Sequence, residues 1–176
     1  MYQPAEDSLL LEKYVEKFAF GKVLDIGTGI GIQAVAATRN KAVKYVLAID
    51  IDKEAINYCK RNIKNKKILF MNSDLFSNVN EKFDTIIFNP PYLPEDKDLE
   101  DKEIYGGKNG IEIIDRFFSE VKNYLNKKGN ILLVFSSITG KKKVDEIIKK
   151  AGFKFKELGK QHIFFEDLFV YLIQWP

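Results

Sequence analysis

Apolar residues along the chain follow two different spacings. After Asp7 or Ser8, either of which can cap a helix, they recur every three or four positions as far as Phe18, the spacing of an amphipathic helix. Other stretches, such as "KVLDIG" and "FDTIIF", are short continuous apolar runs, which are typical of strands buried on both faces. We expect helices at 7–18, 31–39, 53–64, 110–125 and 142–152, and strands at 22–27, 45–50, 67–72, 83–88, 131–137, 153–158 and 168–175.

The order of these elements predicts an α/β fold. Strands alternate with helices along most of the chain, which favours a parallel sheet with helices on both faces. The last two strands are joined by a connection too short for a crossover helix, so they should pair antiparallel. We therefore expect a doubly wound, mostly parallel sheet of seven strands with the last strand antiparallel, built as a single domain over residues 1–176.

Composition narrows the class of protein. A chain of 176 residues with 45% hydrophobic residues is typical of a soluble globular domain. The N-terminus has no basic region leading into an apolar run, and no apolar segment approaches about 18 residues, so we expect no signal peptide, no membrane span and a cytoplasmic location. A single cysteine, Cys59, and a single histidine, His162, predict neither a disulfide nor a metal site. The net charge of +3 is lower than a dedicated nucleic-acid binder usually carries.

A glycine-rich turn, "LDIGTGIGI", follows the first strand. Gly27, Gly29 and Gly31 allow a tight turn and let the backbone approach a ligand closely. A dinucleotide fingerprint needs its third glycine one position later, where this chain has Ile32. Asp25 would oppose a pyrophosphate, whereas it suits the ammonium of an amino-acid moiety. The turn therefore favours S-adenosylmethionine, which carries that ammonium and no phosphate.

Two further strand ends carry acidic residues. Asp50, in "LAIDID", lies roughly 20 residues past the glycines, from where a carboxylate can accept hydrogen bonds from ribose hydroxyls. Asp52 is better placed as the N-cap of the next helix. In "MNSDLF", Asp74 can accept a hydrogen bond from an adenine amino group, with Leu75 against the ring. One such aspartate is commonly a cap or turn residue, but acids and glycines at successive strand ends predict one shared cofactor site.

The strand at 83–88 stops abruptly at Asn89, Pro90, Pro91 and Tyr92. The two prolines donate no N–H and fix φ near about −65°, so they cannot continue the ladder. We expect this strand beside the first one, which would make Asn89 face the reactive methyl of the cofactor. The side-chain oxygen of Asn89 and the carbonyl of Pro90 could accept the two N–H bonds of an amide, with Tyr92 packed on its plane. A simple strand stop is the alternative interpretation.

These motifs together resemble a known family. The segments "DIGTGIG", "AIDID", "SDL" and "NPPY" are similar, in order and spacing, to class I S-adenosylmethionine-dependent methyltransferases, whose fold is Rossmann-like. "QPAEDSLLL" (3–11) and "GGKNGIEIIDRFF" (106–118) resemble the HemK-type glutamine N5-methyltransferases of the short archaeal and eukaryotic branch. The resemblance implies a substrate clamp at Asn89 with its Pro-Pro-Tyr. It also implies cofactor contacts at Ser8, Asp25, Gly27, Asp50, Asp74 and Leu75.

The resemblance further implies a substrate and partners. That family methylates the glutamine of the Gly-Gly-Gln loop in class I translation termination factors. Its bacterial members carry a helical N-terminal docking domain, and because the glycine motif here starts at residue 27, we expect no separate docking domain. Some relatives work with a small zinc-containing activator subunit that adds to a sheet edge, and the strand at 67–72 could accept such pairing.

Several alternatives stay open at this stage. The same branch is implicated in protein lysine methylation, so lysine is a second candidate acceptor. A nucleic-acid amino-methyltransferase acting on adenine N6 or guanine N2 would suit "NPPY" and the mildly basic charge, although no target-recognition region is visible in the sequence. A nicotinamide-dependent dehydrogenase is disfavoured by the position of the third glycine. An inactive partner subunit is disfavoured by the intact Asn-Pro-Pro-Tyr.

Overall fold

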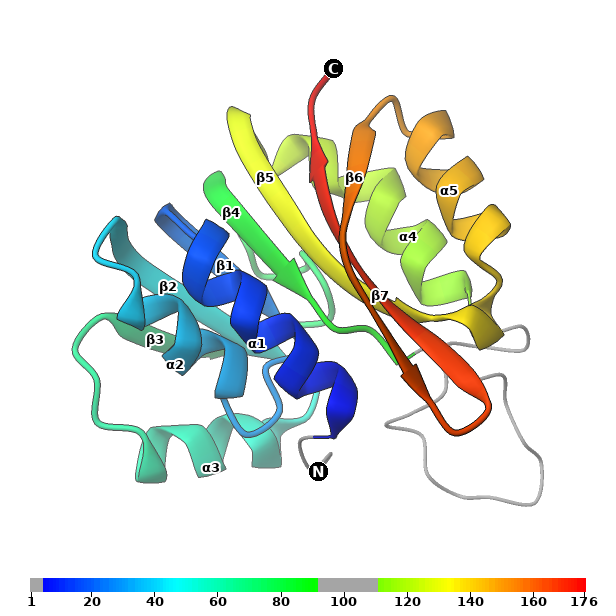
Figure 1. Cartoon of the computed structure of the whole chain (residues 1–176). Helices are drawn as coiled ribbons and strands as arrows, with labels where there is room; N and C mark the ends of the chain where they lie inside the picture. Colours follow the sequence, from blue (N-terminus) through cyan, green and yellow to red (C-terminus); the bar gives the residue numbers. More distant parts are fainter. Residues whose placement is uncertain (1–4, 92–110) are drawn as a thin grey trace.

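The structure, a computed structural model, describes residues 5–91 and 111–176 (Figure 1). Its helices are α1 (Glu6–Phe18), α2 (Ile32–Arg39), α3 (Lys53–Asn62), α4 (Glu112–Glu120) and α5 (Lys141–Lys150), with short 3-10 turns η1 (Val121–Asn123) and η2 (Ser137–Thr139). Its strands are β1 (Gly21–Ile26), β2 (Val43–Asp50), β3 (Ile68–Asn72), β4 (Phe83–Phe88), β5 (Leu125–Ser136), β6 (Lys154–Ile163) and β7 (Glu166–Gln174). Each helix and strand expected from the apolar pattern is present in this set.

The strands form one sheet of seven in the order β3-β2-β1-β4-β5-β7-β6. Strands β1 to β5 pair parallel with one another, and β7 pairs antiparallel with both β5 and β6. The predicted mostly parallel sheet with one reversed strand is therefore confirmed. The chain order turns back at β1, which lies between β2 and β4, and ligands of doubly wound sheets bind outside the carboxyl ends of the strands at such a point.

Helices cover both faces of the sheet (Figure 1), with a layer of apolar side chains beneath them on each face. One layer lies between the sheet and helices α1 and α2, and the other lies between the sheet and helices α4 and α5. Successive residues of β1 show the alternation, because Val23 belongs to the first layer and Leu24 to the second, and neither is exposed. This double burial explains why the central strands appear as continuous apolar runs in the sequence.

The start of β5 differs from the sequence prediction. We expected a helix over 110–125 and a strand over 131–137, but α4 ends at Glu120 and β5 already begins at Leu125. The polar first part of β5, before the expected start at 131, pairs irregularly with β4, and Asn126 in it donates a hydrogen bond to Asp84 (Nδ2–Oδ1 2.8 Å). The helix prediction is wrong in its last turn because these partners come from β4, which local spacing cannot reveal.

The last two strands are longer than predicted. β6 continues past the expected end at 158 to Ile163, and β7 begins at Glu166, so only two residues form the hairpin turn. β6 is an edge strand with several exposed polar residues, so its second half lacks the apolar run that marks a buried strand. Pairing with β7 fixes it as a strand instead.

Candidate active site

The glycine turn lies at the carboxyl end of β1, next to the end of β4. Gly27, Gly29 and Gly31 have φ angles of 68°, 54° and 87°, the left-handed region that side chains rarely adopt. A Cβ atom on Gly27 would lie 3.9 Å from the carbonyl oxygen of Asn89, so the turn and the strand end are neighbours. A Cβ on Gly31 would collide with Ile63, at 2.4 Å from its Cδ1. The absence of a side chain at Gly31 therefore lets the start of α2 pack closely against Ile63, in the segment after α3.

Asp50 at the end of β2 holds the glycine turn in place. Its Oδ2 accepts a hydrogen bond from the backbone N–H of Gly29 (2.8 Å), and its Oδ1 accepts one from the N–H of Asp52 (2.9 Å). Asp52 caps α3 by accepting from the N–H of Glu54 (2.8 Å), which confirms its predicted capping role. Directly after Asp50, Ile51 exposes 69% of its surface, an apolar group that the sequence analysis did not single out.

Asp25 is a buried carboxylate within β1. It is 2% exposed, its Oδ2 accepts a hydrogen bond from Thr28 Oγ1 (2.6 Å), and a further bond comes from the backbone of Ala34 in the first turn of α2. Burial raises the pKa of Asp25 to about 7; the Thr28 hydrogen bond opposes that rise and the nearby charge of Asp50 adds to it. Burial thus disfavours the ionised form, which a cation placed beside Asp25 would stabilise. The predicted ammonium of an amino-acid moiety fits this requirement.

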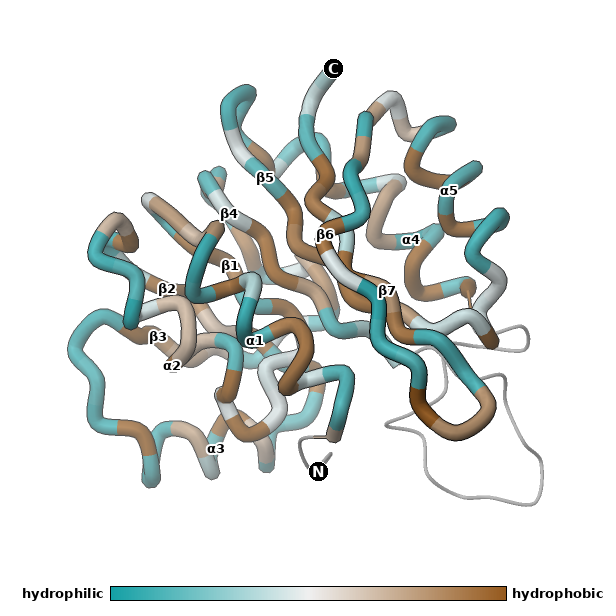
Figure 2. The backbone as a smooth tube through the Cα atoms, viewed as in Figure 1, coloured by the Kyte–Doolittle hydropathy of each residue, from teal (hydrophilic) through white to brown (hydrophobic). Residues whose placement is uncertain are grey.

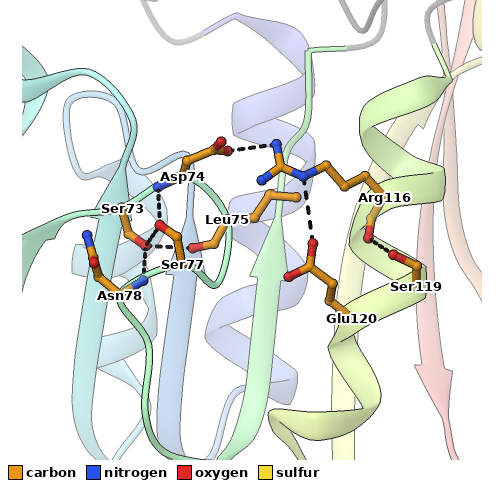
Figure 3. Close-up of polar contacts among 8 residues, drawn as sticks. All are labelled: Ser73, Asp74, Leu75, Ser77, Asn78, Arg116, Ser119 and Glu120. Atoms are coloured by element: carbon orange, nitrogen blue, oxygen red, sulfur yellow. Dashed lines mark hydrogen bonds and ion pairs between the residues drawn. The ribbon is translucent and has the colours of Figure 1, made fainter.

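Asp74 and Leu75 follow β3, in a turn that lies beside α4 (Figure 3). Asp74 faces α4, where Arg116 Nη1 donates to its Oδ1 (2.9 Å), and the same guanidinium lies 3.6 Å from Glu120. The N–H of Asp74 also donates to Ser77 Oγ (3.1 Å), which closes the turn. Leu75 has a φ of 43° and is 6% exposed, packed in the layer beneath α4 and α5. The turn thus pairs the Asp74 carboxylate with α4 and buries the Leu75 side chain in the core.

Asn89 lies at the carboxyl end of β4 with its amide turned toward α1. Its Nδ2 lies 3.2 Å from Asp7 Oδ2 and 3.3 Å from Ser8 Oγ. Because an ionised carboxylate accepts but cannot donate, the NH2 group must face Asp7 and the Oδ1 atom must face away. Oδ1 is buried and accepts no hydrogen bond from the described part of the chain. Leaving such an acceptor unpaired costs about 1–3 kcal/mol, which is typical of a site that a ligand completes.

The first turn of α1 supports this corner. Asp7 and Ser8 are 3% and 2% exposed, and the N–H of Ser8 donates to Asp7 Oδ1 (2.5 Å). Gln33 of α2 donates from Nε2 to the carbonyl oxygen of Ser8 (2.8 Å), which ties the two helices together. The prediction that Asp7 or Ser8 caps α1 is wrong, because the N-cap is Ala5 and both side chains point to the strand end instead. Asp7 thus joins the site from a position 82 residues away from Asn89.

The predicted residues not yet described are the two prolines, Tyr92 and parts of the two family segments. Pro90 is buried and Pro91 is half-buried, directly after Asn89. Tyr92 lies outside the described residues, as do residues 3–4 and 106–110 of the two family segments. The sequence analysis missed Asp7 as an Asn89 partner, together with Gln33 and Arg116. No spacing rule connects these residues to the strand ends. Asp7 and Gln33 are buried polar residues of α1 and α2, so their place among apolar neighbours was the only sequence signal, and the exposed Arg116 carried none.

Two smaller observations bear on chemistry. Cys59 is fully buried, its Sγ lies 3.2 Å from the carbonyl oxygen of Gly29, and burial raises the pKa of its thiol to about 11, so it is an unreactive packing residue. Within residues 5–91 and 111–176, no three His, Cys, Asp or Glu side chains gather closely enough to hold a metal ion. In the same ranges no helix has the length and apolar character needed to cross a membrane.

Known proteins share both the sequence pattern and the fold. The methyltransferase small domain family matches residues 6–164. A Methanocaldococcus jannaschii protein assigned by name to the protein N5-glutamine methyltransferases is 42% identical over 178 residues, which cover 97% of this chain and 89% of that protein. The release factor glutamine methyltransferase of Streptococcus pneumoniae is 32% identical over 153 residues, covering 80% of this chain and 50% of that enzyme. This chain thus matches only about half the length of that bacterial relative.

Solved structures of methyltransferases share the fold of this chain. In the E. cuniculi Mtq2–Trm112 complex, responsible for methylation of the eRF1 translation termination factor, one chain superposes with a TM-score of 0.79 at 25% identity and covers 99% of this chain and 98% of that one. A Pyrococcus furiosus methyltransferase superposes with a TM-score of 0.71 at 24% identity, covers 100% of this chain and 88% of that one, and supports the fold alone.

The sheet order and the polar strand ends define a class I methyltransferase, the class whose cofactor is S-adenosylmethionine. Within this class, the chain belongs to the methyltransferase small domain family, and the resemblance to protein glutamine N5-methyltransferases is confirmed by its relatives.

Proposed function

We propose that this protein transfers a methyl group from S-adenosylmethionine to the side-chain amide of a glutamine, the one in the Gly-Gly-Gln loop of a class I translation termination factor. The single observation that carries the proposal is the buried Oδ1 of Asn89, which accepts no hydrogen bond from the described residues and is turned away from Asp7. The relatives named as glutamine methyltransferases support the choice of acceptor. A substrate in the translation machinery implies a cytoplasmic location.

The acids at successive strand ends would hold the cofactor. Asp25 would attract its ammonium group, since burial without a cation already disfavours the ionised carboxylate. Asp50 would meet the ribose hydroxyls, and Asp74, fixed by Arg116, would accept from the adenine amino group. The exposed side chain of Ile51 offers an apolar surface beside the base. Gly27 and Gly29 keep this edge free of side chains. When bound, the cofactor supplies a methyl group attached to a positively charged sulfur.

Asn89 would act on the acceptor amide. An amide nitrogen is a poor nucleophile because its lone pair is delocalised into the carbonyl, so it has to be held and polarised. Asn89 Oδ1 would accept one N–H of the glutamine amide and the carbonyl of Pro90 would accept the other. Both hydrogen bonds strengthen as the nitrogen becomes more positive, so they stabilise the transition state more than the ground state. The methylated nitrogen, cationic once its lone pair has formed the new N–C bond, would then lose one of its two protons to water. Asp7 is a positioning residue in this scheme, because it fixes which end of the Asn89 amide faces the substrate.

A methyl-transfer assay tests the proposed function. Labelled cofactor is incubated with the intact termination factor and with the same factor carrying an alanine in place of the loop glutamine. We expect label on the first protein only, on the glutamine when the product is mapped by mass spectrometry. Label that persists on the replaced protein, or that maps to lysine, would refute glutamine as the acceptor. Parallel reactions with RNA and DNA test adenine N6 and guanine N2 as acceptors.

We further propose that the outer edge of β3 is the place for a small activator subunit. β3 forms one edge of the sheet, and Leu69 on it is 58% exposed. An open strand edge can pair with a strand of another chain. The second chain in the Mtq2–Trm112 complex makes such a partner worth testing here, and a pull-down probed for a small zinc protein is the direct test.

A further inference from the structure

The exposed apolar side chains of this protein gather at one end of the sheet. Among the described residues, the large hydrophobic side chains that are exposed are Leu9, Ile51, Leu69, Ile138, Phe164 and Phe165. All except Leu69 belong to segments at the carboxyl ends of the parallel strands. The most exposed are Phe164 (89%) and Phe165 (99%), which form the turn between β6 and β7. Figure 2 shows this apolar tip at the end of the hairpin, between hydrophilic flanks.

The hairpin holds these two rings outward. Phe164 has a φ of 36°, a left-handed conformation that is a genuine outlier for a bulky residue and is retained where the surrounding structure enforces it. The flanking residues are tied down: the N–H of Asp167 donates to Ser137 Oγ (2.9 Å), and Ser136 bonds to Glu166. The base of the tip is therefore fixed to the end of β5.

The charged groups beside the tip are paired with each other. Lys160 Nζ lies 2.9 Å from Asp167 Oδ2, and His162 Nδ1 lies 3.0 Å from Asp167 Oδ1. The carboxylate thus compensates the positive charge of Lys160 on β6, next to the turn. A membrane surface or a nucleic acid, both rich in phosphate, would find little uncompensated positive charge here. The chemistry of the tip instead suits an apolar patch on another protein.

Strand register places the tip at the same end of the sheet as Asn89, two strands to the side and beyond the end of β4. Phe88 pairs with Leu133 of β5, and Leu133 pairs with Tyr171 of β7. Phe165 comes six positions before Tyr171, so at about 3.4 Å per residue the tip extends up to roughly 20 Å beyond the level of Phe88. β7 is two strands away from β4, roughly 10 Å at about 4.8 Å per strand. The tip therefore stands beside the approach to Asn89, on the side from which a substrate must come.

We propose that Phe164 and Phe165 form a docking element for the protein substrate, binding an apolar patch on the termination factor next to its Gly-Gly-Gln loop. This inference rests on the proposed function. A folded protein that brings a loop glutamine to Asn89 must pass the projecting hairpin, whereas a small metabolite would not touch it. Two exposed aromatic rings on a rigid turn are the kind of residue that dominates protein interfaces.

The test is a double variant, Phe164→Asn/Phe165→Ser, in the full chain. Asparagine tolerates a left-handed φ, and both replaced rings are exposed, so the variant should keep its fold and its melting temperature. A matched control, Lys154→Ser, changes an exposed side chain at the opposite end of β6 from the tip. The KM for the intact termination factor, kcat at saturation and the Kd for S-adenosylmethionine are measured for all three proteins.

We expect the KM for the factor to rise about 10-fold in the double variant, as when an interface anchor is lost, with kcat and the cofactor Kd unchanged. The control should behave like the wild type. If the wild type methylates the factor and the double variant has the same KM, the docking role is refuted while the proposed function stands. If the wild type does not methylate the factor, the proposed function itself fails. A loss of self-association or of vesicle binding in the variant, without a change in KM, would assign the tip to another partner and overturn the inference.

Discussion

The two halves of the candidate site are built differently. On the cofactor side, the contacts join residues within or between successive motifs: Thr28 bonds to Asp25, three positions away, and Gly29 bonds to Asp50, 21 positions away. On the substrate side, Asn89 at the end of β4 depends on Asp7, 82 positions away, in helix α1. In the proposed scheme, the difference teaches that cofactor binding would depend on strand-end motifs, whereas the orientation of Asn89 depends on the packing of α1 against the sheet. Variants should therefore separate cofactor affinity from rate.

The largest difference between the effect on rate and the effect on cofactor affinity is expected for Asn89→Ala. It removes the acceptor that would polarise the glutamine amide, so the rate should fall on the order of 100-fold or more, as for loss of one preorganised polar group. Cofactor affinity should stay at the wild-type value, because the acids at the ends of β1, β2 and β3 are untouched. Single-turnover kinetics together with calorimetry measure the two quantities. Unchanged turnover would remove Asn89 from the mechanism.

The variant Asp7→Asn is expected to have a smaller effect, because asparagine has nearly the same side-chain shape as aspartate. An asparagine at this position can donate as well as accept, so it no longer forces the NH2 group of Asn89 toward α1, and a flipped Asn89 would present a donor to the substrate. We expect kcat to fall about 10-fold or more with the cofactor Kd unchanged. The control is Glu6→Gln on the neighbouring, exposed position, which should have no effect. Equal kcat in Asp7→Asn and the wild type would show that Asp7 is only a packing residue.

On the cofactor side, Asp25 should control affinity and its pH dependence. Its pKa in the folded protein is about 7, raised from 3.8, so the folded state holds more protons than the unfolded state between these values. The contribution of Asp25 to stability therefore falls as pH rises through this range and levels off above about 7. An ammonium ligand favours the ionised form, so cofactor affinity should weaken below about pH 7.

The variant Asp25→Asn tests both effects. It should melt at a higher temperature than the wild type at pH 8, because the buried charge is gone, and it should bind the cofactor about 10-fold more weakly, without the pH dependence. Thermal unfolding and calorimetry between pH 6 and 8 provide the data. A variant that is less stable at pH 8 and binds as tightly as the wild type would contradict this role for Asp25.

The smallest effect is expected for Arg116→Gln. The ion pair with Asp74 is half-exposed, and such pairs contribute about 0–1 kcal/mol, so the cofactor Kd should rise only about threefold. Arg39→Gln, which breaks an exposed pair of α2 with Glu12 and Glu16, is the matched control and should leave the Kd unchanged. Equal effects of the two changes would mean that Arg116 does not position Asp74.

The same contrast explains what could be predicted from the sequence. β4 was predicted at its observed bounds and β1 within one residue, because strands buried on both faces leave a continuous apolar pattern. The polar residues that end these strands, such as Asp25 and Asn89, could be identified because the carboxyl ends of parallel strands share one edge. The glycine turn was visible because only glycine adopts its positive φ angles freely.

The sequence predictions that failed concern features that depend on contacts between distant segments. Asp7 and Ser8 look like helix caps locally, and only the packing of α1 on the sheet turns them toward Asn89. Arg116 lies on a helix whose position relative to Asp74 follows from the sheet order, which the apolar pattern does not encode. The early start of β5 depends on pairing with β4 for the same reason.

A structure of the wild-type protein with S-adenosylhomocysteine and a glutamine-bearing substrate would test the central claim most directly. The account predicts that Asn89 Oδ1 lies about 3 Å from the Nε2 atom of the substrate glutamine, while Nδ2 still faces Asp7. An Asn89 carboxamide turned away from the glutamine, or one that offers its NH2 group to it, would contradict the account.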